Sequence, residues 1–313
     1  MGCLGLRLGN WGWDERASLN LSLETIKLGF CSDDHNVGCI DVERKALLKL
    51  KQGLTDPSGQ LSSWVGEDCC KWSGVGCNNK TGRVNRLDLG NHDGYEENAF
   101  DGEISPSLLV LKDLEYLDLS MNNFVGVQFL SFIGSLEKLK YLNLSRTYFV
   151  GVIPPNLGNL SRLLYLDLSV QTLETDLQWL ATLSYLKYLN LGGVNLTKTT
   201  SYWLPANNLT GKLHDSLGYL KSLRYLHLSY NSFQGSIPKS IGNLTSLEEF
   251  YLGSNQMSGI IPESLWELSS LVSLDIYGNA WEGAITEAHF VKLGGLREVS
   301  IGNDPQTFPW FST

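Results

Sequence analysis

Apolar and polar residues alternate along most of this chain in a phrase that returns about every 24 residues. Its fullest copy, residues 223–244, reads Leu-x-x-Leu-x-Leu-Ser-x-Asn-x-Phe-x-Gly-x-Ile-Pro and ends in Ile-Gly-x-Leu. The Leu-x-Leu part has the period of a β-strand with one buried face, and the Ile-Gly-x-Leu part predicts a short helical turn. A unit this small cannot bury its own leucines. The repetition therefore predicts stacked coils that share one continuous core.

The last aliphatic residue of each Leu-x-Leu pair measures the length of the coils. Successive gaps are 30, 25, 24, 23, 13, 24, 24, 24 and 25 residues. The gap of 30 holds a polar insertion, residues 92–98, which predicts a surface loop. The gap of 13 is half a coil, so we expect residues 199–204 to form the next strand, either in a distorted coil or beside missing sequence near Trp203. The residues used for this measurement are Leu89, Leu119, Leu144, Leu168, Leu191, Leu204, Leu228, Leu252, Ile276 and Ile301.

An asparagine follows the strand in most coils. Its amide can satisfy backbone groups of neighbouring coils at a turn that is buried from water. Thr147, Gln171 and Val194 interrupt the row, so we expect those coils to be less regular, and we expect Asp304 to take the place in the last coil. The glycine and proline of Gly-x-Ile-Pro favour a tight bend and a coil boundary. The asparagines of the row are Asn122, Asn207, Asn231, Asn255 and Asn279.

The segment before the repeats, residues 39–83, is predicted to cap the open end of the first coil. Residues 41–53 have the pattern of a helix with one apolar face, with Asp41 as its N-cap and Gly53 at its exit. An uncovered end of stacked coils would expose leucines, so a cap is physically required.

Cysteines frame this cap, and none of the six in the chain lies in the repeats. A group of four around a small module is typical of disulfides formed outside the cell. Three pairings of Cys39, Cys69, Cys70 and Cys77 are possible, of which we favour Cys39 with Cys69 and Cys70 with Cys77. A zinc site is the alternative, and it is disfavoured because no histidine or second cysteine pair lies at ligand spacing.

Composition narrows the class of partner. The net charge is −9 and no basic cluster is present, which argues against nucleic acid. No stretch approaches the roughly 20 apolar residues of a membrane-spanning helix. Residues 1–38 are predicted to be an incomplete or degraded leader without fixed structure, because their apolar runs are too short or too interrupted for a signal peptide.

Several Asn-x-Ser/Thr glycan acceptors agree with passage through a secretory pathway, although the repeat phrase itself generates some of them. A sugar on Asn143, which lies on a predicted strand, would block a ligand there, so we expect binding to lie C-terminal of that coil. The acceptors predicted to be modified are Asn79, Asn143, Asn159, Asn195, Asn208 and Asn243.

Three segments give the chain a family likeness. They are Cys-Ile-Asp-Val-Glu-Arg-Lys-Ala-Leu-Leu at 39–48, Cys-Cys-Lys-Trp-Ser-Gly-Val-Gly-Cys at 69–77 and Gly-Arg-Val at 82–84, which leads into repeats with Gly-x-Ile-Pro. The chain thereby resembles plant leucine-rich-repeat receptor-like proteins, most closely those of the fungal-xylanase-receptor and scab-resistance type.

The resemblance implies an α/β leucine-rich-repeat solenoid. Its fold would be a right-handed superhelix with a concave parallel β-sheet, convex short helical turns and an N-terminal disulfide-stapled helical cap, with the array at 84–313 truncated and irregular near 195–207. Such receptors lie at the plasma membrane with the repeats outside the cell, and they signal through partner receptor kinases. We expect this chain to be an N-terminal ectodomain fragment of a membrane-anchored parent.

Outward positions of the predicted strands are the candidate contact residues for an apoplastic peptide or protein. Five tyrosines share one column, which either contacts a ligand or packs along the sheet as a ladder. Departures from the column favour specificity. The predicted ligand contacts are Tyr188, Tyr225, His227, Tyr230, Glu249, Tyr251, Asp275 and Tyr277.

Three functions remain to be compared. The favoured one is the ligand-recognition module of a plant immune or developmental receptor, and a receptor kinase whose kinase lies beyond the sequence is a variant of it. The alternative is a secreted inhibitor of a microbial cell-wall-degrading enzyme, although such inhibitors end in a cysteine-bearing cap and no cysteine follows Cys77. An enzyme is disfavoured because no nucleophile elbow, metalloprotease pair or phosphate loop is present, and no cofactor is expected.

Overall fold

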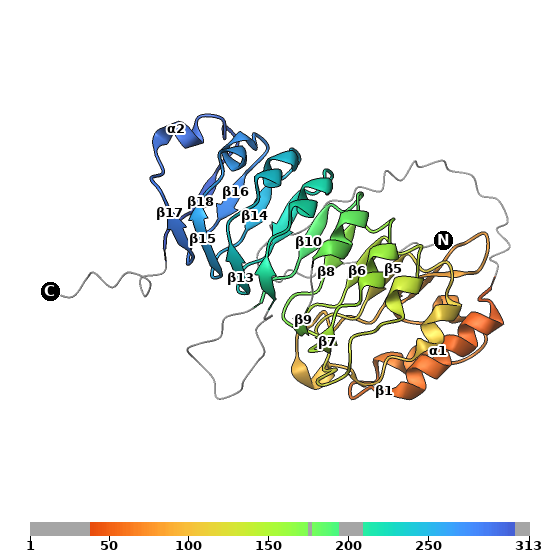
Figure 1. Ribbon diagram of the computed structural model, residues 1–313. Coiled ribbons are helices and arrows are strands. Elements are labelled where there is room, and N and C mark those ends of the chain that lie inside the picture. Colours follow the sequence, from red (N-terminus) through yellow and green to blue (C-terminus); the bar gives the residue numbers. More distant parts are fainter. Residues whose placement is uncertain (1–37, 175–176, 194–208, 304–313) are drawn as a thin grey trace, which may run out of the picture. The chain divides into compact units, whose positions relative to one another are not determined.

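The computed structural model describes residues 38–174, 177–193 and 209–303, all of them within one compact unit. Figure 1 shows these residues as a row of stacked coils that begins at the cap helix α1 (Asp41–Gly53). Residues 1–37 of the predicted leader lie outside the described residues, as do Leu204, Asn207, Asp304 and the acceptors Asn195 and Asn208.

In the part of the chain that the structure describes, ten strands form the main sheet. Neighbouring strands are parallel, except for the antiparallel pair β2 and β3 at the cap end. The register aligns the central leucines of successive coils, for example Leu117 with Leu142 and Leu166 with Leu189. In order across the sheet the strands are β2 (Val75–Cys77), β3 (Val84–Asp88), β5 (Tyr116–Asp118), β6 (Tyr141–Asn143), β8 (Tyr165–Asp167), β10 (Tyr188–Asn190), β12 (Tyr225–His227), β14 (Glu249–Tyr251), β16 (Ser273–Asp275) and β18 (Glu298–Ser300).

The sheet passes directly from β10 to β12, with Leu189 beside Leu226. Our expectation that residues 199–204 form the intervening strand was therefore wrong. The coil between these two leucines is 37 residues long, so it carries an insertion and is not half a coil. The error arose because a local Leu-x-Leu-like spacing does not reveal which strand pairs with which.

Further strands follow the turn in several coils. A four-stranded parallel sheet, here called the second sheet, contains β11 (Thr210–Lys212), β13 (Ser232–Gly235), β15 (Gln256–Ile260) and β17 (Ala280–Glu282). A parallel pair, β7 (Val150–Val152) and β9 (Thr172–Glu174), lies earlier in the array, and β1 (Leu54–Thr55) pairs antiparallel with β4 (Asp101–Gly102).

The predicted helical turns are 3₁₀ helices, with a short α-helix, α2 (Glu287–Phe290), in the last coil. Several 3₁₀ helices of the array begin at or directly after a proline, whose missing N–H costs nothing at the start of a helix. The others begin at the corresponding place in their own coils. In the array they are η4 (Pro106–Val110), η5 (Ile133–Ser135), η6 (Pro155–Asn159), η7 (Gln178–Thr182), η8 (Asp215–Tyr219), η9 (Lys239–Asn243) and η10 (Glu263–Glu267). The three others are η1 (Gln60–Ser63), η2 (Cys69–Lys71) and η3 (Glu96–Asn98).

One hydrophobic cluster runs through the coils from Leu47 in the cap to Leu293 in the last coil. The leucines at the centre of the main-sheet strands are fully buried, including Leu117, Leu166 and Leu226. Fully burying one leucine contributes about 1.5–3 kcal/mol, so the shared core stabilises the stack coil by coil.

The asparagine row hydrogen-bonds the turns together as predicted. In Asn122, for example, Oδ1 accepts the Phe100 N–H at 2.8 Å and Nδ2 donates to the Leu89 carbonyl at 2.8 Å. Gln171 replaces this function where asparagine is missing: its Oε1 accepts the Phe149 N–H at 2.8 Å and its Nε2 donates to Thr147 Oγ1 at 2.8 Å.

Two expectations about this row need correction. Thr147 and Gln171 are both fully buried and hydrogen-bonded, so the row is substituted at these coils and not broken. In the last coil the position belongs to Asn303, whose Oδ1 accepts the Trp281 N–H at 2.9 Å, and not to Asp304. Val194 lies outside the described residues.

The cap contains the predicted helix, but its start differs from the expectation. Ile40 is the N-cap residue and makes no side-chain capping bond, whereas Asp41 is helical and pairs with Arg44 at 2.5 Å. At its end, Gly53 is required because a Cβ there would lie 2.7 Å from the Glu103 carbonyl oxygen. Trp64 and Trp72 are buried and stacked at 5.4 Å, and they cover the first coil.

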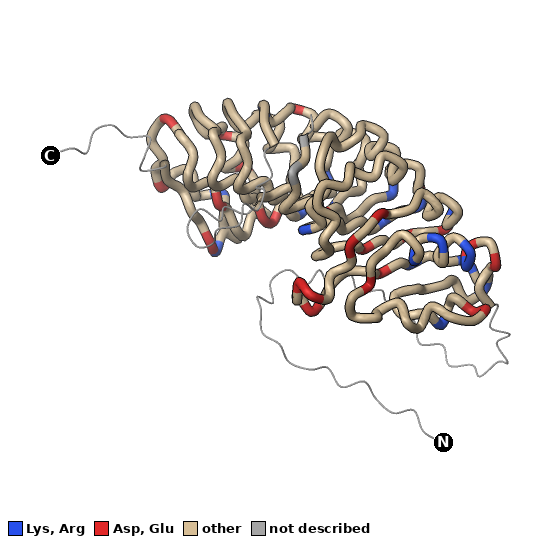
Figure 2. The backbone as a smooth tube through the Cα atoms, turned by 90° about the horizontal axis from the view of Figure 1, so that it is seen from below, with Lys and Arg blue, Asp and Glu red and all other residues tan. Residues whose placement is uncertain are grey.

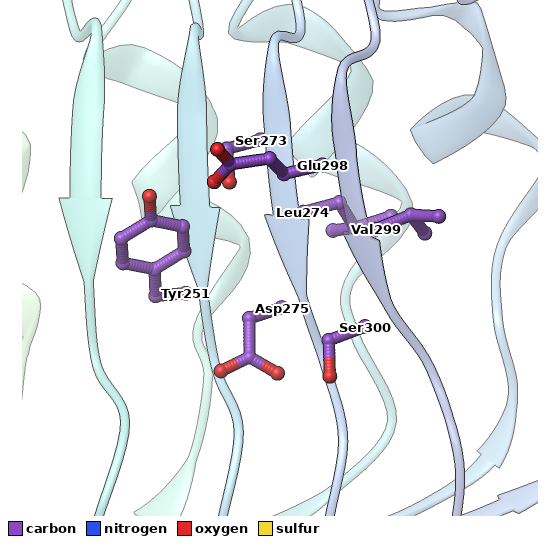
Figure 3. Close-up of a pocket in the computed structure, with 7 residues that line it drawn as sticks. All are labelled: Tyr251, Ser273, Leu274, Asp275, Glu298, Val299 and Ser300. Carbon is purple, nitrogen blue, oxygen red and sulfur yellow. The ribbon is translucent and has the colours of Figure 1, made fainter.

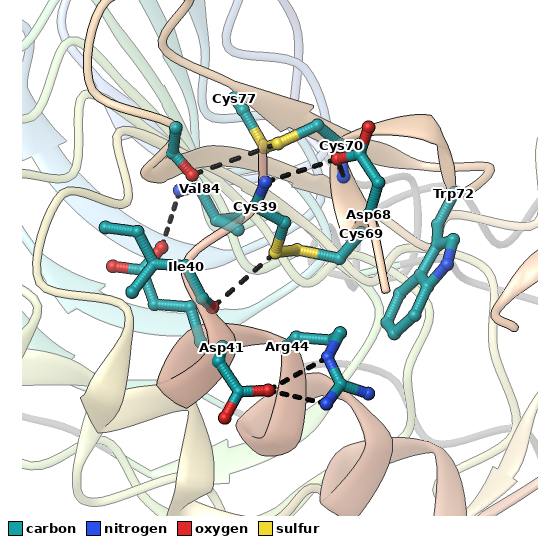
Figure 4. Close-up of a disulfide and its surroundings, with 12 residues drawn as sticks. Cys39, Ile40, Asp41, Arg44, Asp68, Cys69, Cys70, Trp72, Cys77 and Val84 are labelled. Carbon is teal, nitrogen blue, oxygen red and sulfur yellow. Dashed lines mark hydrogen bonds and ion pairs between the residues drawn. A yellow bond between two sulfur atoms is a disulfide. The ribbon is translucent and has the colours of Figure 1, made fainter. Parts of the chain in front are cut away.

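The cap disulfides have the pairing that the sequence favoured. Cys39 is joined to Cys69 and Cys70 to Cys77, with Cα atoms 5.3 and 5.5 Å apart (Figure 4). The carboxylate of Glu43, fully buried on the apolar face of α1, accepts the Val84 N–H at 2.7 Å and ties the helix to the first strand of the array.

Candidate functional site

The outer face of the main sheet presents two columns of side chains, because residues on either side of each buried leucine point away from the core. From β5 to β18, the first column holds the residue that opens each strand, and the second holds the residue that ends it. The first column is Tyr116, Tyr141, Tyr165, Tyr188, Tyr225, Glu249, Ser273 and Glu298; the second is Asp118, Asn143, Asp167, Asn190, His227, Tyr251, Asp275 and Ser300.

Four tyrosines of the first column stack face to face across neighbouring strands. From Tyr116 to Tyr188 their ring centroids are 4.1, 4.3 and 4.3 Å apart and their planes lie within 12° of one another. The guanidinium carbon of Arg86 lies 3.6 Å from the centroid of Tyr116 and closes one end of the stack. We call these four residues the tyrosine ladder.

Two buried aspartates of the second column anchor this ladder. Asp118 Oδ1 accepts the Ser120 N–H at 2.9 Å, while its Oδ2 accepts Tyr141 OH and Asn143 Nδ2, both at 3.2 Å. Asp167 repeats the arrangement one coil further on, with the Ser169 N–H at 2.9 Å and Asn190 Nδ2 at 3.1 Å.

Burial changes the pKa of Asp167 and of two tyrosines of the ladder. It raises the pKa of the Asp167 carboxyl above its usual range, and it raises the pKa of the Tyr141 and Tyr165 hydroxyls far above theirs. The hydroxyls therefore stay protonated and act as hydrogen-bond donors.

The stacking shows that the tyrosine column packs along the sheet, which is one of the two possibilities that the sequence left open. Tyr188, which we expected to contact a ligand, is only 7% exposed, because it stacks on Tyr165 and lies beside the edge of the His227 ring. It offers a ligand little surface.

The ladder stops at Tyr188, and Tyr225 in the next strand does not continue the face-to-face stacking. Its ring is 6.0 Å from Tyr188 and tilted by 42°, and its hydroxyl donates to Glu248 Oε2 at 3.1 Å. Arg224 pairs with the same glutamate. The next first-column residue is Glu249, so the stack has no aromatic partner to continue on.

Beyond this break, four of the predicted contacts meet on adjacent strands. His227 pairs with Glu249 at 3.0 Å and stacks on Tyr251 at 4.5 Å. Asp275 follows Tyr251 in the second column, on β16. We call the outer face from β12 to β18 the open half of the sheet. Tyr230 and Tyr277, in the turns that follow, are 43% and 44% exposed.

Two hollows adjoin Tyr251, one on the open half and one that spans the boundary between the open half and the tyrosine ladder. One is lined by Tyr251, Ser273, Leu274, Asp275, Glu298, Val299 and Ser300. Figure 3 shows the Tyr251 ring together with the carboxylates of Asp275 and Glu298 around this hollow. The other brings Arg146 and Ser229 together with Asn190, His227 and Tyr251. Glu298 was not among the predicted contacts, although its outward strand position marked it.

Charges are spread unevenly over the described residues. Figure 2 shows basic residues gathered in the cap, where α1 alone carries Arg44, Lys45, Lys49 and Lys51. On the open half, the acidic Glu249, Asp275 and Glu298 occupy column positions against one histidine.

The glycan acceptors occupy different environments. Asn79, Asn159 and Asn243 are exposed, whereas the Asn143 amide that would carry a sugar donates to Asp118 and its Oδ1 accepts the Ser145 N–H. This geometry argues against our expectation of a glycan at Asn143, because modification would break the anchor of the ladder.

The described residues contain one group with metal-ligand spacing, formed by Cys39, Cys69 and Cys70. All three sulfurs are in disulfides and are not available as thiolate ligands. In the same residues, no helix combines the length and apolar character needed to cross a membrane.

Family comparisons match the cap and the repeats separately. A leucine rich repeat N-terminal domain matches residues 40–78, and leucine rich repeat families match residues 113–136, 138–160 and 221–280. These matches confirm the leucine-rich-repeat fold expected from the sequence.

Curated relatives are plant receptors. The chain is 40% identical over 187 residues to receptor-like protein EIX1 of Solanum lycopersicum, which covers 56% of this chain and 18% of that one. It is 39% identical over 181 residues to a Cf-9 homolog of the same species, covering 52% of this chain and 21% of that one. A putative receptor-like serine/threonine-protein kinase of Arabidopsis thaliana is 43% identical over 131 residues, 39% of this chain and 13% of that one. The chain therefore spans about a fifth or less of these relatives.

Solved plant proteins share the fold. The ectodomain of the Arabidopsis receptor kinase HAESA, solved with the peptide hormone IDA and the co-receptor SERK1, has a TM-score of 0.73 and 31% identity over 84% of this chain and 42% of that one. A plant ice-binding protein has a TM-score of 0.70 and 26% identity over 85% of this chain and 80% of that one.

Proposed function

We propose that this chain, a leucine-rich-repeat protein related to plant receptor-like proteins, recognises an extracellular peptide or protein on the open half of its main sheet. It would do so as part of the ectodomain of an immune or developmental receptor at the plasma membrane. The relatives that share its sequence are receptor-like proteins, and the ectodomain of the receptor kinase HAESA shares its fold.

The change in the outer face at Tyr225 carries this proposal. Before it, the tyrosine ladder saturates its own hydrogen bonds and stacking partners, so little is left for a ligand. After it, aromatic and charged side chains surround one hollow on the parallel sheet, and a second hollow spans the change, with Arg146 and Asn190 before it and His227 and Tyr251 after it. Rigid aromatic anchors beside polar groups are typical of recognition surfaces.

Signalling would need partners. The HAESA complex contains a peptide hormone and a co-receptor, which supports a peptide ligand and partner receptor kinases for this chain as well. We propose that the parent protein is anchored in the membrane and passes the binding event to such kinases.

An N-linked sugar introduced at a chosen surface position, here called a glycan wedge, tests where binding occurs. Glu298→Asn creates an Asn-Val-Ser acceptor on the open half with one substitution, and Gln256→Asn creates an Asn-Met-Ser acceptor on the second sheet. The full chain, fused to a secretion leader and made in a eukaryotic host, would be panned against a random dodecapeptide library displayed on phage. Peptide mapping would verify that each acceptor carries a sugar.

We expect peptides selected on the unmodified chain to lose binding to the Glu298→Asn wedge and to keep binding to the Gln256→Asn control. Glu298→Gln separates the sugar from the loss of charge. Selected peptides that bind both wedges equally would place recognition elsewhere and refute the proposal, as would a library that yields no specific peptide.

A further inference from the structure

The second column gives an internal comparison of three aspartates at equivalent strand positions. In Asp118 and Asp167, Oδ1 accepts the N–H of the serine two residues later, at 2.9 Å in both. Asp275 makes the same bond, with the Tyr277 N–H at 3.1 Å. The backbone therefore orients all three carboxylates alike.

Their second carboxylate oxygens differ. Oδ2 of Asp118 accepts a tyrosine hydroxyl and an asparagine amide, both from the next coil. Oδ2 of Asp167 likewise accepts Asn190 Nδ2 of the next coil. The coil after Asp275 supplies Glu298 and Ser300 at these places, and among the described residues Asp275 Oδ2 has neither a hydrogen-bond donor nor an ion-pair partner. A half-buried carboxylate thus lacks two donors that the repeat supplies elsewhere.

The surroundings of Asp275 favour a cation as the missing partner. Glu298 places a second acidic group on the same hollow, and Tyr251 places an aromatic ring beside it (Figure 3). Gly253 leaves the room that Asp275 occupies, because a Cβ at that position would lie 2.8 Å from Asp275 Oδ2. Carboxylates next to a tyrosine ring bind ammonium and guanidinium groups through charge-assisted hydrogen bonds and cation–π contact.

We infer that this hollow binds the lysine or arginine side chain of an extended peptide lying along the open half. The inference rests on the proposed function and adds the chemistry of the ligand. The cationic group would donate to Asp275 Oδ2, as Tyr141 and Asn143 donate to Asp118. Complementary charge would set which peptides bind, and the sheet would set their extended conformation.

The test uses the dodecapeptides selected on the full secreted chain and depleted of those that still bind the Glu298→Asn wedge. We expect a recurrent arginine or lysine in this set. We expect weaker binding when that arginine is replaced by citrulline, its neutral isostere, or that lysine by norleucine. The dissociation constant should rise about tenfold, which is the order expected for one charge-assisted pair.

Matched variants assign that loss to Asp275. Asp275→Asn removes the charge without creating a glycan acceptor, because the residue two places later is Tyr277. It should weaken the arginine peptide about tenfold and leave the citrulline peptide unchanged. Glu282→Gln, an exposed acidic residue of β17 on the second sheet, makes the same change in net charge and should have no effect. Equal thermal unfolding midpoints would show that the variants are folded.

The outcomes separate the two proposals. Wedge-sensitive peptides that lack a cationic residue, or losses from citrulline and Asp275→Asn that add independently, would overturn this inference and leave the proposed function intact. A selection without any wedge-sensitive peptide would overturn the proposed function, and this inference with it.

Discussion

The carboxylate of Glu43 offers the sharpest test of how the cap is held to the array. It is fully buried, and it accepts the Val84 N–H at 2.7 Å and a bond from Arg83 Nη1 at 3.1 Å. In Glu43→Ala the Val84 N–H, itself fully buried, would lose its partner. A hydrogen bond to a charged group contributes about 1.5–3 kcal/mol and an orphaned buried donor costs about 1–3 kcal/mol, so we expect local destabilisation of about 3 kcal/mol.

Hydrogen–deuterium exchange of peptides covering β3 measures this loss directly. A change of about 3 kcal/mol in the free energy of local opening corresponds to roughly a hundredfold faster exchange at Val84. Glu43→Gln keeps an acceptor for Val84 and should exchange at an intermediate rate. Asp41→Ala removes an exposed ion pair of the same helix and should change exchange less than about twofold.

Unchanged exchange at Val84 in Glu43→Ala would refute the reasoning, because the bond would then not limit opening. An equal effect of Asp41→Ala would also refute it, because the cause would then be loss of helix charge and not loss of the buried acceptor.

Three further predictions follow from individual contacts. Gln171→Ala leaves the buried Phe149 N–H without its acceptor and should lower the free energy of unfolding by about 2 kcal/mol, measured by chemical denaturation; no change would show that the substituted row is not structural. The hydrogen bond to Asp88 raises the pKa of His92, so its small stabilising contribution is complete below pH 6.5 and is lost as the pH rises through the raised folded pKa; NMR titration should find this pKa above 6.5, and Asp88→Asn should lower it. Peptide mapping of the secreted chain should find sugar on the exposed Asn243 and none on Asn143, and an occupied Asn143 would contradict the ladder geometry.

The coils could be predicted from the sequence because each repeats the same local physics. A leucine every second residue, followed in most coils by an amide at the turn, specifies a strand and its boundary. Strand pairing could not be predicted with the same success where a coil carries an insertion. The sheet joins Leu189 to Leu226 across the segment in which we had expected another strand. That pairing depends on residues far apart in the chain, which a local spacing does not record.

The sequence of the cap helix already contains a signal for its attachment to the array. Glu43 lies on the same helical face as Ala46, Leu47 and Leu50, all of them buried. A lone carboxylate in an apolar stripe is stable only if it finds donors, so its position already indicated a partner. The identity of that partner, the N–H of Val84, required the fold.

The sequence predicts which residues of the candidate site face outward, but it does not predict whether each of them stabilises the fold. Outward positions could be read from the two-residue period, yet whether a tyrosine or an aspartate there is structural depends on what the next coil supplies. Asp118 receives its donors from Tyr141 and Asn143, and it belongs to the scaffold. Asp275 has the same backbone setting, but the coil beside it brings Glu298, which has no donor when ionised, and Ser300, whose hydroxyl makes no hydrogen bond to Asp275. The same repeat position therefore receives donors from the next coil at Asp118 and receives none at Asp275, and the difference follows from the residues one coil further along.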